Sequence, residues 1–212
     1  MNQSVQNIST ELNKRLAYPY KWGTKQTNVL DGQTRFIYKT FAFDKLLQII
    51  EDKFKNERNY ELIKNYALNR WYNFNSAMAV ESIFKTHKKV KSTENAKDKA
   101  VDFFIDDIPF DHKTTVFPRG LKMSFNEAIN QKEDVVKWLY KNQSSQGRFH
   151  LKNRLFIILY AKSGQHWKLK AHLKKIEQAV KQYLDNFDAT KLIELNLEGT
   201  EKAQSDLIWV IS

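Results

Sequence analysis

The chain has 212 residues, of which 42% are hydrophobic and 13% aromatic, and this composition suits one sizeable domain with an ordinary core. Its formal net charge of +11 at pH 7 favours a polyanionic partner, most often nucleic acid. It contains no cysteine, no apolar run typical of a signal peptide and no stretch of about eighteen apolar residues, so we expect a soluble cytoplasmic protein without disulfides, thiolate zinc sites or a membrane span.

Hydrophobic periodicity predicts helices and strands along the whole chain. In chain order we expect a short polar helix or a loosely ordered start at 1–16, an irregular segment at 17–34, helices at 36–54 and 59–87, a charged connector at 90–99, a hairpin at 101–115, a helix at 125–140, a loop at 142–153, a strand at 155–160, a helix at 166–187 and closing strands at 192–197 and 207–211. The run at 155–160 is apolar throughout, which is typical of a strand covered on both faces. The expected fold class is α/β, a mixed central sheet flanked by helices, with a helical N-terminal extension at 1–70 packed on one compact core at 71–212.

The irregular segment at 17–34 mixes aromatic rings with two cations, Lys21 and Lys25. Rings beside lysines can stack on bases and meet phosphates, so both lysines are candidates for contact with nucleic acid. The alternative is that the rings fix a long loop to the core.

The long helix expected at 59–87 carries a carboxylate within its apolar stripe. Glu81 lies between Met78 and Phe84 along that stripe. A buried unpaired carboxylate is costly, so Glu81 should have a partner. Two alternatives stay open: Glu81 serves a functional site, or it pairs with a nearby Lys or Arg at the edge of the stripe.

The segment at 101–115 predicts two strands joined by a tight turn at 106–107. In that register Asp102 lies directly opposite Asp111, and Lys113 points to the same face, while the alternate residues form an apolar face. Two facing carboxylates repel unless a cation lies between them, and Mg²⁺ prefers such oxygen ligands together with substrate phosphate. The pattern predicts a metal site for phosphodiester chemistry; the alternative is a chance spacing of common residues.

This order of elements resembles the PD-(D/E)XK nuclease superfamily, which has the restriction-endonuclease-like fold. The matching features are an acidic residue on a helix (Glu81), an Asp on the first hairpin strand (Asp102), and Asp111-His112-Lys113 on the second strand. A helix, a buried strand and a further helix follow, as in the common core of the family. The resemblance covers residues 71–211, and it departs from the family name in having Val101 where proline would precede Asp102.

The resemblance implies a metal-dependent endonuclease that hydrolyses phosphodiester bonds of DNA, of restriction or phage-defence type. Asp102 and Asp111 would hold Mg²⁺, or Mn²⁺ as its substitute, with the backbone carbonyl of His112 as a further ligand. Glu81 would bind a second ion or orient a metal-bound water. Lys113 would position the attacking water and offset charge on the phosphate. The side chain of His112 is expected to point toward the core by alternation.

Several cations are candidates for binding nucleic acid. They are Lys21, Lys25, Arg119, Lys122, Arg148, Lys152 and Arg154. For any one of them the alternative is an ordinary surface cation. Double-stranded DNA is the expected partner, no membrane partner is expected, and a homodimer is one expected assembly because restriction enzymes often dimerise to cut both strands. The competing interpretations are a non-cleaving nucleic-acid-binding module on the same fold, and a structural or partner-binding protein in which the motif is coincidence.

Overall fold

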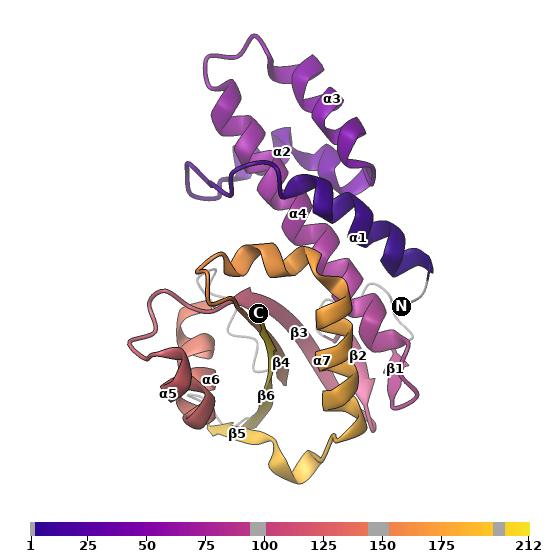
Figure 1. The fold of residues 1–212 in the computed structure, drawn as a ribbon, viewed down its shortest axis with the longest axis vertical. Helices are drawn as coiled ribbons and strands as arrows, with labels where there is room; N and C mark the ends of the chain where they lie inside the picture. Colours follow the sequence, from indigo (N-terminus) through magenta and orange to yellow (C-terminus); the bar gives the residue numbers. More distant parts are fainter. Residues whose placement is uncertain (1–2, 94–100, 144–152, 197–201) are drawn as a thin grey trace.

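The computed structural model describes residues 3–93, 101–143, 153–196 and 202–212, and it places a helical part next to a sheet that is flanked by helices (Figure 1). Within these ranges the elements are α1 (Gln3–Arg15), α2 (Asn28–Gln33), the 3-10 helix η1 (Arg35–Lys39), α3 (Phe43–Phe54), α4 (Tyr60–Lys85), β1 (Val90–Ser92), β2 (Phe103–Ile105), β3 (Ile108–Val116), α5 (Phe125–Asn130), α6 (Lys132–Gln143), β4 (Arg154–Tyr160), η2 (His166–Ala171), α7 (Leu173–Asp185), η3 (Ala189–Lys191), β5 (Ile193–Asn196) and β6 (Lys202–Ile211). Among the helices of these ranges, none combines the length and the apolar character needed to cross a membrane.

The strands of the described ranges form one mixed sheet in the order β1-β2-β3-β4-β6-β5. Strand β2 runs antiparallel to β1 and β3, the strands β3, β4 and β6 are parallel, and β5 runs antiparallel to β6. Helices α4 and α7 contribute to the core on one face, and α5 and α6 to the core on the other (Figure 1). The expected mixed sheet flanked by helices is confirmed.

Strand β4 is buried on both faces, as its apolar sequence predicts. Leu155, Ile157 and Leu159 belong to the core formed with α4 and α7. Phe156 and Ile158 point the other way into the core formed with α5 and α6. Successive side chains of a strand point to opposite faces, so a strand with helices on both sides needs an unbroken apolar run.

The hairpin turn lies where the sequence places it. Asp106 and Asp107 have φ values of 46° and 69°, so both central residues are left-handed, as a two-residue type I′ turn requires. Phe103 pairs with Phe110 in the expected register. The sequence missed β1, a three-residue edge strand inside the segment expected to be a connector; its mixed sequence is too short to show alternation.

Several expected helices are divided. The helix expected at 36–54 breaks between η1 and α3, where the Thr40 carbonyl accepts a 2.7 Å hydrogen bond from the buried Trp71 indole. Glu11 of α1 then accepts a 2.6 Å hydrogen bond from the Phe43 N–H and so satisfies a free donor in the first turn of α3. The helices expected at 125–140 and 166–187 are likewise interrupted. Tertiary contacts of this kind have no signature in hydrophobic spacing.

Helix α4 belongs to both parts of the molecule. Near its start it packs against α1 and α3, and farther along it packs against β1, β3 and α7 (Figure 1). A boundary at residue 70 falls inside this helix, and a single hydrophobic cluster includes Val5 near the start of the chain and Val210 near its end. The helical extension and the sheet therefore share one core.

The buried guanidinium of Arg15 holds the irregular segment in place. It donates hydrogen bonds of 2.7 Å to the Tyr18 carbonyl, 2.9 Å to the Pro19 carbonyl and 2.6 Å to Asn69 Oδ1. No carboxylate of the described residues pairs with it, and burial lowers its pKa. It lies 5.7 Å from the centre of the Trp167 ring, which favours the cation. The aromatic residues of this segment thus fix the loop to the core.

Candidate active site

Asp111 and Lys113 point to the same face of β3. In the parallel pairing with β4, Asp111 lies beside Arg154 and Lys113 beside Phe156. Phe156 belongs to the core formed with α5 and α6, and neighbouring paired residues share a face. The face of β3 that carries these polar groups is therefore the one toward α6, and both residues are only partly buried.

Arg154 is an ion-pair partner of Asp111. Its Nε donates a 2.7 Å hydrogen bond to Asp111 Oδ2, and the two side chains are only 11% and 25% exposed. The guanidinium lies 5.8 Å from the centre of the Tyr140 ring on α6. Burial lowers the pKa of Lys113 and the Arg154 charge lowers it further, although Asp111 acts in the opposite direction. Arg154 was expected to contact nucleic acid; its pairing with Asp111 depends on the register of β3 and β4 and is evident only in the folded chain.

Asp102 is hydrogen-bonded to His112. Asp102 Oδ2 accepts a 2.8 Å hydrogen bond from the His112 backbone N–H and lies 2.6 Å from His112 Nδ1. The His112 side chain is only 6% exposed and its ring lies against Phe84 and Phe103, so the expectation that it points toward the core is confirmed.

The expected placement of Asp102 directly opposite Asp111 is therefore wrong: the Asp102 carboxylate is bonded to His112 instead. Asp102 precedes β2, and its backbone N–H bonds to the Phe110 carbonyl, the residue that already pairs with Phe103. The regular register ends at this point, and the side chain of Asp102, rather than its backbone, meets His112. The repulsion expected between the two carboxylates is relieved because each has a basic partner.

Glu81 has the partner that its position demanded. It forms an ion pair with Lys85, one turn farther along α4. Burial raises the pKa of Asp102, but the hydrogen bonds and charge of His112, together with the charge of Lys85, hold that pKa below its usual value. Glu81 and Asp102 thus share Lys85 as an electrostatic neighbour on the α4 side of the sheet.

The bonded state of Asp102 predicts an effect on acid stability. Its folded-state pKa lies below the unfolded value of about 3.9, so it stabilises the fold above about pH 4, and this contribution is lost as the pH falls through the folded-state pKa. We expect Asp102→Asn to be less stable than the parent at neutral pH and to lose less stability between about pH 4 and pH 2. Urea unfolding in EDTA, followed by circular dichroism at several pH values, measures the free energy of unfolding of both proteins and how it changes with pH.

Asp52→Asn, which removes an exposed carboxylate on α3, is the matched control and should keep the parent's acid dependence. Parallel curves for Asp102→Asn and the parent would show that the Asp102–His112 bonds do not stabilise the fold.

The residues offer oxygen ligands for a divalent cation, although they do not form a closed cage. In the part of the chain that the structure describes, no three His, Asp or Glu side chains gather into a group that could hold a metal ion. The His112 N–H points toward Asp102, and the carbonyl of a strand residue points the same way as its N–H. Mg²⁺ is commonly held by one or two carboxylates with water and substrate phosphate. Asp111 supplies one such carboxylate on the face toward α6, whereas the Asp102 carboxylate is bonded to His112 on the α4 side of the sheet.

The predicted nucleic-acid contacts lie in several places. Lys21, Lys25, Arg119 and Lys122 are exposed, and none has an ion pair within the described ranges. Arg154 is largely buried against Asp111. Arg148 and Lys152 lie outside the described residues.

Three segments that contain no Asp or Glu at all supply many of these cations. They are residues 17–27, 112–124 and 155–175. Their exposed cations are Lys21, Lys25, Arg119, Lys122, Lys162, Lys174 and Lys175. We refer to these seven side chains together as the acid-free surface. The lack of acidic residues in each segment is a signal in the sequence that identifies these cations.

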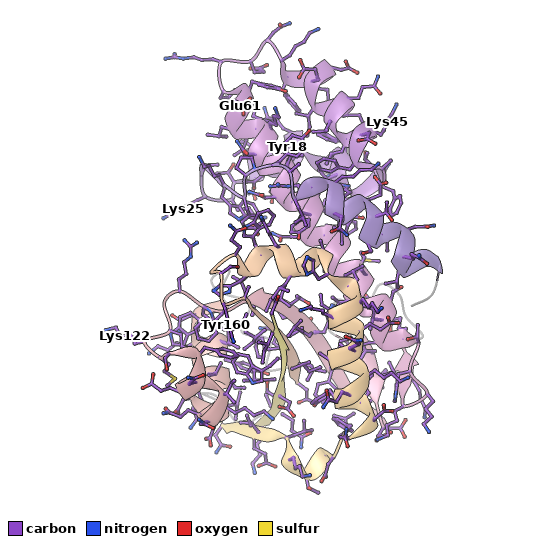
Figure 2. The ribbon with its side chains drawn as sticks, viewed as in Figure 1. Tyr18, Lys25, Lys45, Glu61, Lys122 and Tyr160 are labelled. Atoms are coloured by element: carbon purple, nitrogen blue, oxygen red, sulfur yellow. The ribbon has the colours of Figure 1, made fainter. Side chains whose placement is uncertain are left out.

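Ring contacts bring the three segments together near the carboxyl ends of β3 and β4. Tyr20 stacks on Trp167 with ring centres 5.0 Å apart, and Phe117 meets His166 at 6.2 Å. Burial lowers the pKa of His166, and the charge of Arg119 lowers it further. In Figure 2 Lys25 and Lys122 lie along one side of the molecule. The acid-free surface therefore joins the helical part to the sheet.

Comparison with known proteins adds no relative. A scan against protein-family models finds no match, and searches of curated proteins and of solved structures also find none. What the chain does is inferred from its own residues and their geometry.

Proposed function

We propose that the protein is a Mg²⁺-dependent endonuclease that hydrolyses phosphodiester bonds of DNA. The observation that carries the proposal is the placement of Asp111 and Lys113 on one face of β3, with Arg154 directly beside them on β4. One carboxylate and two cations on a partly buried polar patch suit an attacking water and a phosphate. We also propose double-stranded DNA as substrate, a homodimer that cuts both strands, a cytoplasmic location, and restriction or phage defence as the role.

The order of the elements supports a restriction-endonuclease-like fold of the PD-(D/E)XK type. Helix α4 carries Glu81, the hairpin of β2 and β3 carries Asp102 and Asp111, and α5 and α6 lead to the buried strand β4, which lies next to β3. This is the succession that the resemblance implies: acidic helix, hairpin, helix, buried strand and helix. The proposed site uses the start of β3, where the chain passes from one hairpin strand to the centre of the sheet.

Each residue of the site has a chemical role in the proposal. Asp111 would hold the ion on the face of the sheet toward α6; Asp102 and Glu81 lie on the α4 side and take no part in the site as it is built. A bound Mg²⁺ supplies Lewis acidity and a lowered pKa of the attacking water. Lys113 donates a hydrogen bond to a phosphate oxygen, and its lowered pKa also increases the fraction of free amine that can accept a proton from water. Arg154 is placed to offset phosphate charge.

The test is the cleavage of supercoiled plasmid by the purified protein, with Mg²⁺ and with EDTA, beside an Asp111→Ala variant purified in the same way. The proposal expects nicked or linear plasmid with Mg²⁺ only, and none from the variant. Equal cleavage by the Asp111→Ala protein would show that the site is wrongly assigned or that a contaminant cuts.

A non-cleaving nucleic-acid-binding module is the second candidate. The observation in its favour is the ion pair that already neutralises Asp111, together with the absence of three converging ligands within the described residues. A protein that binds DNA in EDTA and leaves it intact in Mg²⁺ and in Mn²⁺ supports this candidate over the nuclease.

DNA binding should depend on the acid-free surface. We expect the triple variant Lys25→Glu, Lys122→Glu, Lys162→Glu to bind a duplex on the order of a hundredfold more weakly at low salt, because each lysine that neutralises a phosphate releases counterions. Fluorescence anisotropy with a labelled duplex in EDTA measures this without cleavage, and the salt dependence of the affinity should become shallower.

The matched control reverses the same number of charges on α3 and directly after it. Lys45, Lys53 and Lys55 are exposed on or just after α3, and Lys45 lies on the other side of the molecule from Lys25 in the view of Figure 2. Their triple Glu variant should lose much less affinity. Equal losses for the two variants would mean that net charge alone, and not this surface, governs binding.

A further inference from the structure

We infer that Arg154 competes with the divalent cation for Asp111, so that the proposed metal site is closed by a guanidinium in the free protein. The inference rests on the proposed function and adds a regulatory element to it: the protein carries its own cation in the place that the metal would take. Arg154 thereby becomes a positioning residue.

The sheet itself sets this contact. Asp111 and Arg154 are paired positions on adjacent parallel strands, so their side chains leave the backbone side by side on the same face. The 2.7 Å hydrogen bond from Arg154 Nε occupies Asp111 Oδ2. The guanidinium of Arg154 lies 5.8 Å from the centre of the Tyr140 ring. A charged hydrogen bond in a largely buried position is among the stronger polar contacts of a protein.

The local charge balance points the same way. Asp111 has the cations Arg154 and Lys113 as electrostatic neighbours. A divalent ion added while Arg154 stays in place would raise the positive charge of a partly buried patch that contains one carboxylate. Arg154 holds one of the two carboxylate oxygens of Asp111, and its charge repels a divalent ion at the other. The ion and the guanidinium therefore compete for Asp111.

A phosphate relieves this competition. A guanidinium matches the geometry of a phosphate group and binds it with two parallel hydrogen bonds. When Arg154 turns to a phosphate, Asp111 becomes free to bind the ion, so nucleic acid and metal favour one another. By thermodynamic linkage the two effects are equal in size. In the free protein the metal should consequently bind weakly.

Titration of Mn²⁺ into the protein without nucleic acid, followed by the electron paramagnetic resonance signal of the free ion, tests the inference. Arg154→Gln should bind Mn²⁺ about tenfold more tightly than the parent, because one charged hydrogen bond to the ligand is removed. Arg58→Gln removes the same charge from an exposed position outside the proposed sites and should leave the affinity within about twofold of the parent. Equal affinities for the parent and Arg154→Gln, or equal gains for both variants, would overturn the inference.

Two further proteins separate this inference from the proposed function. Asp111→Asn should abolish the tight Mn²⁺ binding that Arg154→Gln gains. If the parent binds Mn²⁺ through Asp111 and Arg154→Gln does not bind it more tightly, only the inference is lost. If neither the parent nor Arg154→Gln binds Mn²⁺ at millimolar concentration, the metal-dependent function fails and the inference with it. Arg154→Lys keeps the charge but loses the Nε–H, so it should bind Mn²⁺ more tightly than the parent, by a smaller factor than Arg154→Gln. If Arg154→Gln does not fold, the Mn²⁺ affinity of Arg154→Lys tests the inference instead.

Discussion

Replacing Asp111 by Asn should reduce the rate of DNA cleavage by about a thousandfold, and replacing Lys113 by Met should reduce it by about a hundredfold. Asn keeps the shape of Asp but gives up the negative charge that would hold the ion. Met keeps the apolar stem of Lys113, which is partly buried, and removes only its charged end. Single-turnover nicking of supercoiled plasmid with protein in excess measures both rates.

The matched control is Glu133→Gln, which removes an exposed carboxylate on α6 and should cleave at the parent's rate. Duplex binding in EDTA should stay close to that of the parent in Asp111→Asn, which shows that chemistry and not affinity has been lost. Cleavage by Asp111→Asn within about threefold of the parent would exclude Asp111 from the reaction, since a metal ligand supplies far more than that.

Replacing Arg15 by Met should lower the free energy of unfolding by about 3–5 kcal/mol. The variant leaves the carbonyls of Tyr18 and Pro19, and Asn69 Oδ1, without the donor that each has in the parent. Arg15 is fully buried, so water cannot take its place without rearrangement. Urea unfolding followed by circular dichroism measures the loss.

Arg35→Met on η1 is the comparison, because Arg35 is exposed and should change stability by less than about 0.5 kcal/mol. A loss under about 1 kcal/mol for Arg15→Met would mean that the carbonyls find other donors. DNA binding gives a second reading: the loop that Arg15 holds carries Lys21 and Lys25, so a loosened loop should also weaken duplex affinity.

The elements that hydrophobic spacing can define were predicted well. The hairpin turn follows from the Asp106-Asp107 pair between two apolar strands, and both residues are left-handed as that turn requires. The buried strand β4 follows from its unbroken apolar run. Helix α4 was also found, with bounds close to those expected. In each of these elements the local preference and the tertiary environment agree.

The parts that depend on long-range contacts were not predictable. Exposed Met78 was assigned to the apolar stripe of α4 because spacing alone cannot tell which neighbours arrive around a helix. The pairing of Asp111 with Arg154 requires the parallel register of β3 and β4, which no local pattern fixes. Asp102 was placed by extending a register that ends one residue earlier. Its bond to His112 therefore appears only in the folded chain.

Helix α4 runs unbroken from the helical part to the edge of the sheet, and one hydrophobic cluster includes residues of both parts (Figure 1). Lys25 and Lys122 thus belong to parts of the molecule that share one core. We expect such a protein to keep its shape on binding, without a hinge motion that closes it around the ligand. If a duplex contacts both parts, as we propose, a protein of fixed shape leaves the adjustment to the DNA, and sequences that deform easily should be preferred even where no base is touched.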